Sequence, residues 1–400
     1  MSIPDRSNQK NSVTQPSSGR FWNDPDKRSL FFQILLVLGL AAFFLYIINN
    51  TLSNLEQRGI TTGFAFLDVE AGFGILQTLI PYTETDSYGR TFLVGLLNTI
   101  LVSVLGIIAA TFLGFFLGVG RLSKNWLISR VCTVYIEIFR NIPLLLQIFF
   151  WYYAVLRTLP SPRQSIEFLG SFLNVRGLYM PEPIGTDGFN SVWIAFFLGI
   201  AATWLLKRWA DKRRDDTGQD FPTLYTSLGL ILGLPLIVFL IMGMPLEIEQ
   251  PALKGFNFVG GMVLVPELMA LWLALTIYTA AFIAEIVRGG ILSVPNGQLE
   301  AASALGLPRG RTLRFIILPQ ALRVIIPPLT SQYLNLTKNS SLATAIGYPD
   351  LVSVFAGTTL NQTGQAIEVI FMTMAVYLTL SILTSIFMNW YNSRKALIER

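Results

Sequence analysis

The chain contains Glu-Ala-Ala-Ser-Ala-Leu-Gly at positions 300–306 and, after nine further residues, Ile-Ile-Leu-Pro at positions 316–319. Alanine is the strongest helix former and has almost no side chain, so the first stretch predicts a short helix that another surface can approach closely. Gly306 is placed to end that helix with a positive φ, and Pro308 suits the first turn of a second helix. We therefore expect two short helices separated by a break.

The chain on both sides of this stretch is far more apolar than a soluble protein. Of its 400 residues, 52% are hydrophobic and 13% are charged, whereas soluble domains carry about 25% charged residues. The excess apolar surface requires a lipid bilayer around it, so we expect a polytopic membrane protein. The net charge of +5 is explained by its distribution across the membrane and does not indicate binding of nucleic acid.

The composition also excludes several kinds of chemistry. The chain has no histidine and one cysteine, Cys132, which rules out imidazole catalysis, histidine metal sites and intrachain disulfides. It has no Gly-rich phosphate-binding loop of the P-loop type. We therefore expect no catalytic residues and no bound metal.

Several apolar segments are long enough to cross a bilayer, which takes about 20 residues. They fall at 30–48, 92–119, 131–156, 190–206, 223–244, 266–287, 321–337 and 368–390. The segment 321–337 contains Pro327 and Pro328 and could be either a span or a re-entrant segment. The predicted fold class is an all-α polytopic membrane protein with about eight transmembrane helices.

Basic residues indicate the orientation. With eight spans and a cytoplasmic N-terminus, the cytoplasmic segments hold about three times as many Lys and Arg residues as the opposite segments, as the positive-inside rule expects. Both termini are therefore predicted to be cytoplasmic. If 321–337 did not span, the basic C-terminal tail would lie outside, which agrees less well with that rule.

The predicted organisation follows from these segments. Its parts are a disordered cytoplasmic tail at 1–29, an extra N-terminal span with an outer loop at 30–91, a transmembrane domain at 92–390, and a cytoplasmic tail at 391–400. The transmembrane domain includes inserted spans near 190–244 and the polar loop 293–320. The long outer loops are expected to act as lids or docking surfaces; they fall at about 49–91, 157–189 and 245–265.

Four stretches together resemble the membrane subunits of ABC-type amino-acid importers. Residues 300–319 fit the pattern E-A-A-x3-G-x9-I-x-L-P, which is similar in full to the EAA loop of ABC importer permeases. Residues 137–147 resemble the E-x-F-R-N-x-P-L-L-x-Q segment of polar amino-acid permeases, and 278–290 and 336–342 resemble neighbouring segments of the same proteins. The likeness covers about 92–156 and 266–390, the five-helix permease core.

The chain is longer than the short members of that family. Its extra N-terminal span and the spans near 190–244 resemble the general L-amino-acid permease subunits, which pair with a second, non-identical permease. The resemblance implies a permease subunit of the bacterial cytoplasmic (inner) membrane that receives amino acids from an extracytoplasmic amino-acid-binding protein. It also implies ABC ATPase subunits as partners, with ATP and Mg bound there and no cofactor in this chain.

In that family the EAA loop forms a coupling helix that sits in a cleft of the ATPase subunit. The resemblance therefore implies a role in ATPase coupling for Glu300, Ala301, Ala302, Gly306, Arg309, Arg311 and Arg314. From the residue types alone, these arginines could equally belong to an ordinary basic loop that their charge holds inside.

Charges within the apolar segments need partners, because each costs about 2.5–3.5 kcal/mol at the bilayer centre. Glu137 and Arg140 share a helical face and are expected to pair with each other or with the adjacent helix; Glu285 and Arg288 repeat the spacing. Both pairs could be structural. Alternatively, the first could be a gate contact that changes partner during transport, and the second could transmit motion of the loop into the helix.

Uncharged polar side chains also occur at membrane depth: Tyr278, Thr279, Ser331, Gln332 and Asn335. They could line a pathway for a zwitterion, or they could make interhelical hydrogen bonds worth about 0.6 kcal/mol each.

An ion-coupled secondary transporter of small polar solutes is the main alternative function. It predicts carboxylates near the membrane midplane and internal repeats, and neither is evident in the sequence. A membrane-embedded enzyme agrees less well, since the apolar segments hold no catalytic cluster.

Overall fold

A computed structural model describes residues 25–57 and 62–395 of the chain. Of the tails predicted at 1–29 and 391–400, residues 1–24 and 396–400 lie outside the described residues, whereas 25–29, predicted to be disordered, and 391–395 are helical. The α-helices are α1 (Pro25–Gln57), α2 (Tyr88–Arg121), α3 (Trp126–Asn141), α4 (Leu144–Phe149), α5 (Phe189–Thr217), α6 (Thr223–Leu228), α7 (Leu234–Ile241), α8 (Pro266–Leu292), α9 (Asn296–Ala304), α10 (Arg309–Thr312), α11 (Leu318–Asn339), α12 (Leu360–Thr363) and α13 (Ala366–Lys395).

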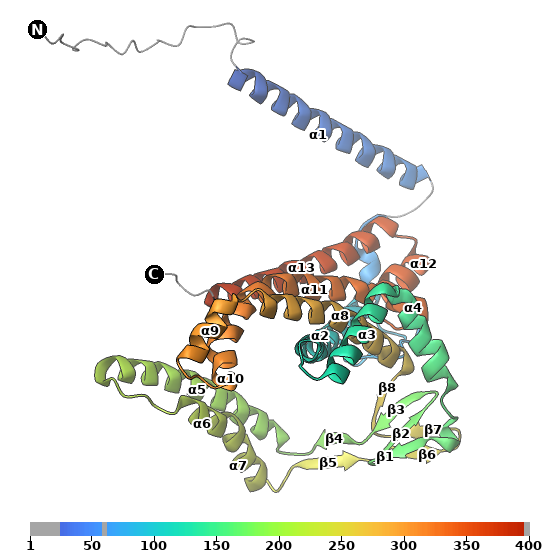
Figure 1. Cartoon of the computed structure of the whole chain (residues 1–400). Helices are drawn as coiled ribbons and strands as arrows, with labels where there is room; N and C mark the ends of the chain where they lie inside the picture. The colour runs from blue at the N-terminus through green and yellow to red at the C-terminus, as the bar shows by residue number, and fades with distance from the viewer. Residues whose placement is uncertain (1–24, 58–61, 396–400) are drawn as a thin grey trace, which may run out of the picture. The chain divides into compact units, whose positions relative to one another are not determined.

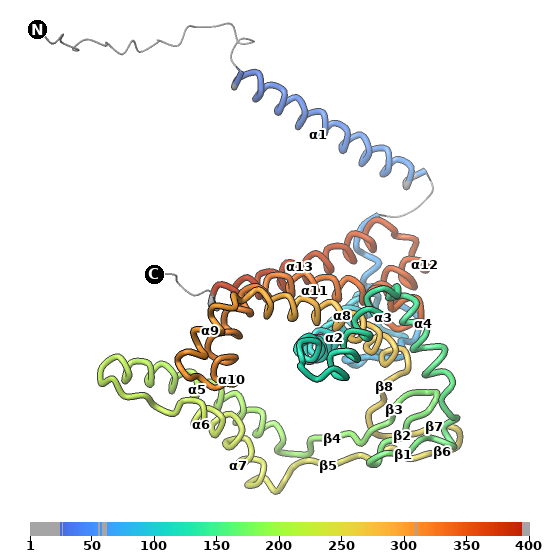
Figure 2. Tube along the Cα trace, in the orientation of Figure 1, coloured from blue at the N-terminus to red at the C-terminus, as the bar shows by residue number. Residues whose placement is uncertain are grey.

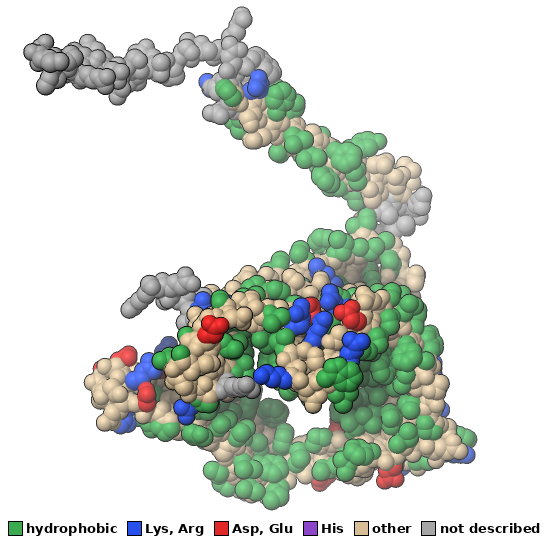
Figure 3. Space-filling model, in the orientation of Figure 1, with side chains coloured by type: hydrophobic (Ala, Val, Ile, Leu, Met, Phe, Trp, Pro, Cys, Tyr) green, Lys and Arg blue, Asp and Glu red, His purple; other side chains and the backbone are tan. Residues whose placement is uncertain are grey.

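The chain divides into two compact units, Met1–Phe64 with Gly364–Glu368 and Ala65–Thr363 with Val369–Arg400. The first contains α1 and the first residues of α13, and the second contains the elements from α2 to α12 and the rest of α13, which Figure 1 labels. Helix α1 exposes large apolar side chains such as Leu36 and Leu38. Hydrophobic side chains also cover much of the second unit (Figure 3), as expected of helices that contact lipid.

Seven helical stretches of the described residues are long and apolar enough to cross a membrane. They are Lys27–Asn54, Tyr88–Arg121, Phe189–Thr217, Thr223–Ile241, Pro266–Leu292, Gly310–Ile346 and Ala366–Ser393. The predicted class of a helical polytopic membrane protein is therefore confirmed. The proline-containing segment 321–337 lies within the sixth of these stretches, which is long enough to span.

The predicted span at 131–156 is instead a bent pair of helices, Trp126–Asn141 and Leu144–Thr158, which meet at 106°. Pro143 disfavours helical geometry at the residue before it, and Ile142 is accordingly extended, with φ −94° and ψ 127°. The Gln147 amide donates hydrogen bonds to the carbonyls of Phe139 and Ile142, both at 3.0 Å. These bonds satisfy carbonyl groups that the broken helix leaves free. The number of spans rises from seven to the predicted eight only if the two helices of this pair cross the membrane together as one span.

Helices α2, α8 and α11 form the core of the second unit. Gly114 and Gly118 of α2 let the backbone of α8 approach closely, because a Cβ at Gly114 would lie 2.6 Å from the Cβ of Ile283 and one at Gly118 would lie 2.6 Å from the carbonyl oxygen of Ala284. Small residues four apart are the usual means of close helix packing in membranes. The contact fixes α2 against α8 along the half that ends at Arg121.

A buried polar network joins the other half of α2 to the segment after α11. Asn98 donates to the carbonyl of Pro349 at 2.9 Å, and the Thr99 hydroxyl accepts from the Leu351 amide at 3.0 Å. Asp350 is fully buried and accepts from the Ser353 amide at 2.8 Å. Burial raises the pKa of Asp350 to about 7, because a carboxylate loses its hydration there.

The loops before α5 and α8, two of the three predicted outer loops, form small antiparallel sheets that were not predicted from the sequence. The strands are β1 (Ile166–Phe168), β2 (Ser171–Asn174), β3 (Gly177–Met180), β4 (Glu182–Gly185), β5 (Leu246–Glu249), β6 (Ala252–Lys254), β7 (Asn257–Val259) and β8 (Met262–Leu264). The sheets have the orders β1-β2-β3-β8, β4-β5 and β6-β7. The loop before α5 therefore pairs with the loop before α8, with Leu178 opposite Leu264, and Figure 2 shows the two loops running together.

Candidate functional site

The loop between α8 and α11 has the predicted form of two short helices with a break. Helix α9 ends in a Schellman motif, in which the Leu307 amide bonds the Ala302 carbonyl and the Gly306 amide bonds the Ser303 carbonyl, both at 3.0 Å. Gly306 has φ +69°, a conformation that residues with a Cβ adopt only at a cost. The motif ends α9 abruptly and turns the chain into α10.

Most residues predicted for ATPase coupling lie on the surface of this loop. Glu300, Ala301, Gly306, Arg311 and Arg314 are exposed, whereas Ala302 is buried. The Arg309 side chain lies outside the described residues. Helix α9 packs on the π-helical turn η7 (Leu313–Ile317) that leads into α11.

The sequence analysis missed the apolar part of this surface. Leu305 is 78% exposed, and Leu299 and Phe315 are also exposed. Leucine and phenylalanine beside arginines and a glutamate make a mixed surface of the kind that proteins bury against a partner. The motif is defined by its glutamate and its small residues, so the role of these larger apolar side chains was not predicted from it.

A cluster of charges lies where α2 ends and α8 approaches the loop. Glu285 pairs with Arg288 on α8 and with Arg121 of α2, in both cases with 2.5 Å between nitrogen and oxygen. Glu137 of α3 lies 3.9 Å from Arg121. The Glu285–Arg288 pair thus has the predicted spacing. Arg121, for which the sequence predicted no role at a site, connects α2 with α3 and α8.

Glu137 and Arg140 do not form an ion pair with each other in the described structure. Of the two predicted arrangements, Glu137 adopts the contact with an adjacent helix, through Arg121. Arg140 places its guanidinium 5.3 Å from the centre of the Phe282 ring on α8, a cation–π geometry. The packing of α3 against α2 and α8 therefore separates the two side chains.

The uncharged pathway candidates fall on two helices of the core. On α8, Thr279 is buried and Tyr278 is half-buried against Phe282, with ring centres 4.9 Å apart. On α11, Gln332 is half-buried and Asn335 is exposed. Tyr333, which follows Gln332 on α11, has its hydroxyl 2.9 Å from the hydroxyl of Thr111 on α2. This hydrogen bond between helices was not predicted from the sequence.

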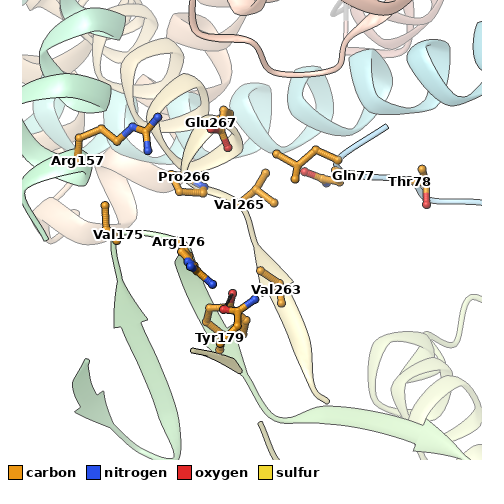
Figure 4. A pocket seen from close by; sticks show the side chains of 12 residues that line it. Gln77, Thr78, Arg157, Val175, Arg176, Tyr179, Val263, Val265, Pro266 and Glu267 are labelled. Atoms are coloured by element: carbon orange, nitrogen blue, oxygen red, sulfur yellow. Dashed lines mark hydrogen bonds between the residues drawn. The ribbon is translucent and has the colours of Figure 1, made fainter. Parts of the chain in front are cut away.

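At the opposite end of α8, a cavity of about 580 Å³ opens between the helix and the strands. We call it the strand-side cavity. Its polar lining residues are Gln77, Thr78, Arg157, Arg176, Tyr179, Asn257 and Glu267, and Figure 4 labels all of them except Asn257. The Tyr152 hydroxyl donates to Glu267 at 2.8 Å. Tyr179 donates to Asn257 at 2.9 Å. These residues come from helices, strands and loops that are distant in sequence, so no local motif indicated the site.

Comparisons with known proteins found a matching family and several similar chains. The family described as binding-protein-dependent transport system inner membrane component matches residues 221–397. The chain is 58% identical to the putative amino-acid ABC transporter permease protein YhdX of Escherichia coli K12, over 94% of this chain and 96% of that protein.

Two further relatives match over nearly their whole length. The chain is 54% identical to the general L-amino acid transport system permease protein AapQ of Rhizobium johnstonii, over 97% of this chain and 98% of that one. It is 43% identical to the glutamate/glutamine/aspartate/asparagine transport system permease protein BztB of Rhodobacter capsulatus, over 93% and 95%.

Proposed function

The chain belongs to the family of amino-acid ABC transporter permeases, and we propose that partner ATPase subunits drive its transport cycle through α9 and α10. The chain is a multi-pass membrane protein. We propose that it lies in the bacterial inner membrane with both termini in the cytoplasm. ATP and Mg bind on the partner subunits. Nucleotide can then shift this chain between conformations only through a contact that differs between them.

The exposed surface of α9 is the contact that we propose for the ATPase. Glu300, Leu305 and Arg311 lie on it without being buried by the rest of the chain. A rigid helix moves as one body when a partner displaces it, whereas a flexible loop deforms. The Schellman motif fixes the end of α9. This abruptly ended, exposed helix is the observation that carries the proposal.

Helix α9 is connected to two membrane helices, α11 and α8. Helix α9 packs on η7, which continues into α11, and it follows α8 after a short connection. The ion pairs of Glu285 join α8 to α2 just before that connection. We propose that displacement of α9 moves α8 and α11 together and thereby changes access to the amino-acid pathway.

The substrates and the other partners rest on the relatives. AapQ and BztB carry names that specify general L-amino acid transport and transport of glutamate, glutamine, aspartate and asparagine. We propose that this chain also transports L-amino acids, received from an extracytoplasmic amino-acid-binding protein. A second, non-identical permease would supply the other half of the pathway.

The glycines of the loop provide a matched test. Gly306→Ala forces a Cβ onto a left-handed residue, at a cost of about 1–2 kcal/mol, although the space around it is open. We expect it to insert normally but to reduce ATPase retention on purification and amino-acid uptake several-fold, and Gly306→Asp to reduce both further. Gly297→Ala, also in open space but without a positive φ, is the control and should behave as wild type.

Uptake by membrane vesicles and the ATPase-to-permease ratio after purification are the measurements. If Gly306→Ala and Gly306→Asp retain wild-type values of both, the coupling role of α9 is wrong. If Gly297→Ala fails equally, the loop is sensitive to any added side chain, and the end of α9 has no special role.

A further inference from the structure

Two residues that line the strand-side cavity, Glu267 and Gln77, each carry a shielded acceptor atom that the described structure leaves without a partner. Glu267 lies in the first turn of α8, where the helix dipole favours a negative charge. Its Oε1 accepts from Tyr152, whereas its Oε2 is shielded from solvent and has no hydrogen-bond partner. The Gln77 Oε1 is likewise shielded and unpaired. Unpaired buried acceptors of this kind cost free energy and call for an explanation.

The same cavity presents two guanidinium groups. Arg157 lies 5.2 Å from the centre of the Tyr152 ring, so one tyrosine holds Arg157 by its ring and Glu267 by its hydroxyl. Arg176 is exposed at the turn between β2 and β3. Within the part of the chain that the structure describes, neither arginine forms an ion pair with a carboxylate.

We propose that the strand-side cavity binds a free zwitterionic amino acid, with its ammonium at Glu267 and its carboxylate at Arg176, since Arg157 already stacks on Tyr152. This inference rests on the proposed function for its orientation, which places the start of α8 on the outer side. The Glu267 carboxylate would repel an anion that has no ammonium group. The two arginines would repel a cation that has no carboxylate. A zwitterion satisfies both signs of charge through charge-assisted hydrogen bonds.

The size of the cavity agrees with a small ligand. Its volume of about 580 Å³ falls within the range of about 300–1,000 Å³ that is usual for small-molecule sites. The walls combine these charges with Val175, Val263 and Val265, which offer apolar contact to a side chain. The amino acid would therefore occupy a site before it enters the membrane pathway.

The test uses the complete complex of this permease with its partners, purified without the binding protein. Binding of a ¹⁴C-labelled L-amino-acid mixture is measured by scintillation proximity. We expect binding by the wild type and at least a tenfold weaker affinity for Arg176→Gln and Glu267→Gln. Arg163→Gln is the matched control, because Arg163 lies in the same outer loop but stacks on Phe256 at 4.7 Å, away from the cavity lining.

Other outcomes would overturn the proposal. Unchanged binding in both variants, or no binding by the wild type, would show that the cavity holds no amino acid. If the variants weaken only the affinity of the complex for the binding protein, the cavity is a docking contact and the proposal is wrong. Should Glu267→Gln fail to assemble, Arg176→Gln remains decisive, since its side chain is exposed.

Uptake with the binding protein present tests the proposed function separately. Normal wild-type uptake together with no amino-acid binding by the complex alone would reject the cavity site and leave the permease function intact. Failure of wild-type uptake would reject the permease function itself.

Discussion

Glu285 joins two arginines on different helices and is therefore the most sensitive charge near the loop. Glu285→Gln removes the negative charge that Arg121 and Arg288 share. Hydrogen bonds to charged groups contribute about 1.5–3 kcal/mol, so we expect a loss of stability of that order and lower transport. Thermal unfolding of the purified complex and uptake in vesicles are the measurements.

Glu137→Gln is the control for this prediction. Glu137 is 59% exposed and lies 3.9 Å from Arg121, and exposed pairs of this kind contribute about 0–1 kcal/mol. The variant should therefore unfold within about 0.5 kcal/mol of the wild type. Equal destabilisation by the two substitutions would mean that Arg121 depends on Glu137 as much as on Glu285.

At this scale, spacing in the sequence predicts contacts only within one helix. Glu285 and Arg288 meet because they are three residues apart on α8. Glu137 and Arg140 have the same spacing, yet the approach of α2 and α8 offers them Arg121 and Phe282 instead. Contacts across helices, including every polar group of the strand-side cavity, depend on tertiary packing that a local pattern does not contain.

Helix α8 carries two adjacent glycines that test the packing of one element against another. A Cβ at Gly290 would collide with the side chain of Ile325 on α11 and lie 3.2 Å from the Ala321 carbonyl oxygen, whereas a Cβ at Gly289 meets nothing within 4 Å. We expect Gly290→Ala to destabilise the complex by about 1–3 kcal/mol, because overpacking forces helices apart. Thermal unfolding measures the change.

Gly289→Ala separates this packing effect from the general effect of alanine in a helix. Alanine favours helix by about 1 kcal/mol over glycine, so Gly289→Ala should be neutral or slightly stabilising. If Gly290→Ala also proves neutral, α8 and α11 are not packed as closely as the structure has them.

Single elements were predictable where the signal is long or chemically specific. The helix, break and second helix at 296–312 follow from alanines, a glycine and a proline at fixed positions. The bend at Pro143 was present in the sequence as Asn-Ile-Pro, but the length and mostly apolar composition of 131–156 favoured a single span. The strands were missed because each has only three or four residues, and because two of the pairings, β3 with β8 and β4 with β5, join loops that are distant in sequence.

For the whole molecule, hydropathy and charge predict the spans but leave one ambiguity. Apolar length identifies a segment without specifying whether it crosses the bilayer or returns to the same side. The ambiguity applies to the helix pair Trp126–Asn141 and Leu144–Thr158, which is bent by 106°. Its behaviour decides the side on which every later loop lies, including the loop that contains α9.

Topology reporters resolve this point. If the bent pair crosses as one span, alkaline phosphatase inserted after Leu169, which is 83% exposed between β1 and β2, should be active on the outer side. Green fluorescent protein inserted after Gly218, between α5 and α6, or fused after Arg400 should then fluoresce in the cytoplasm. If the pair returns to the cytoplasm, all three signals reverse, and α9 would lie outside the cell, where no ATPase could reach it. Because Lys and Arg are concentrated in the segments that the first arrangement makes cytoplasmic, we expect the unreversed pattern.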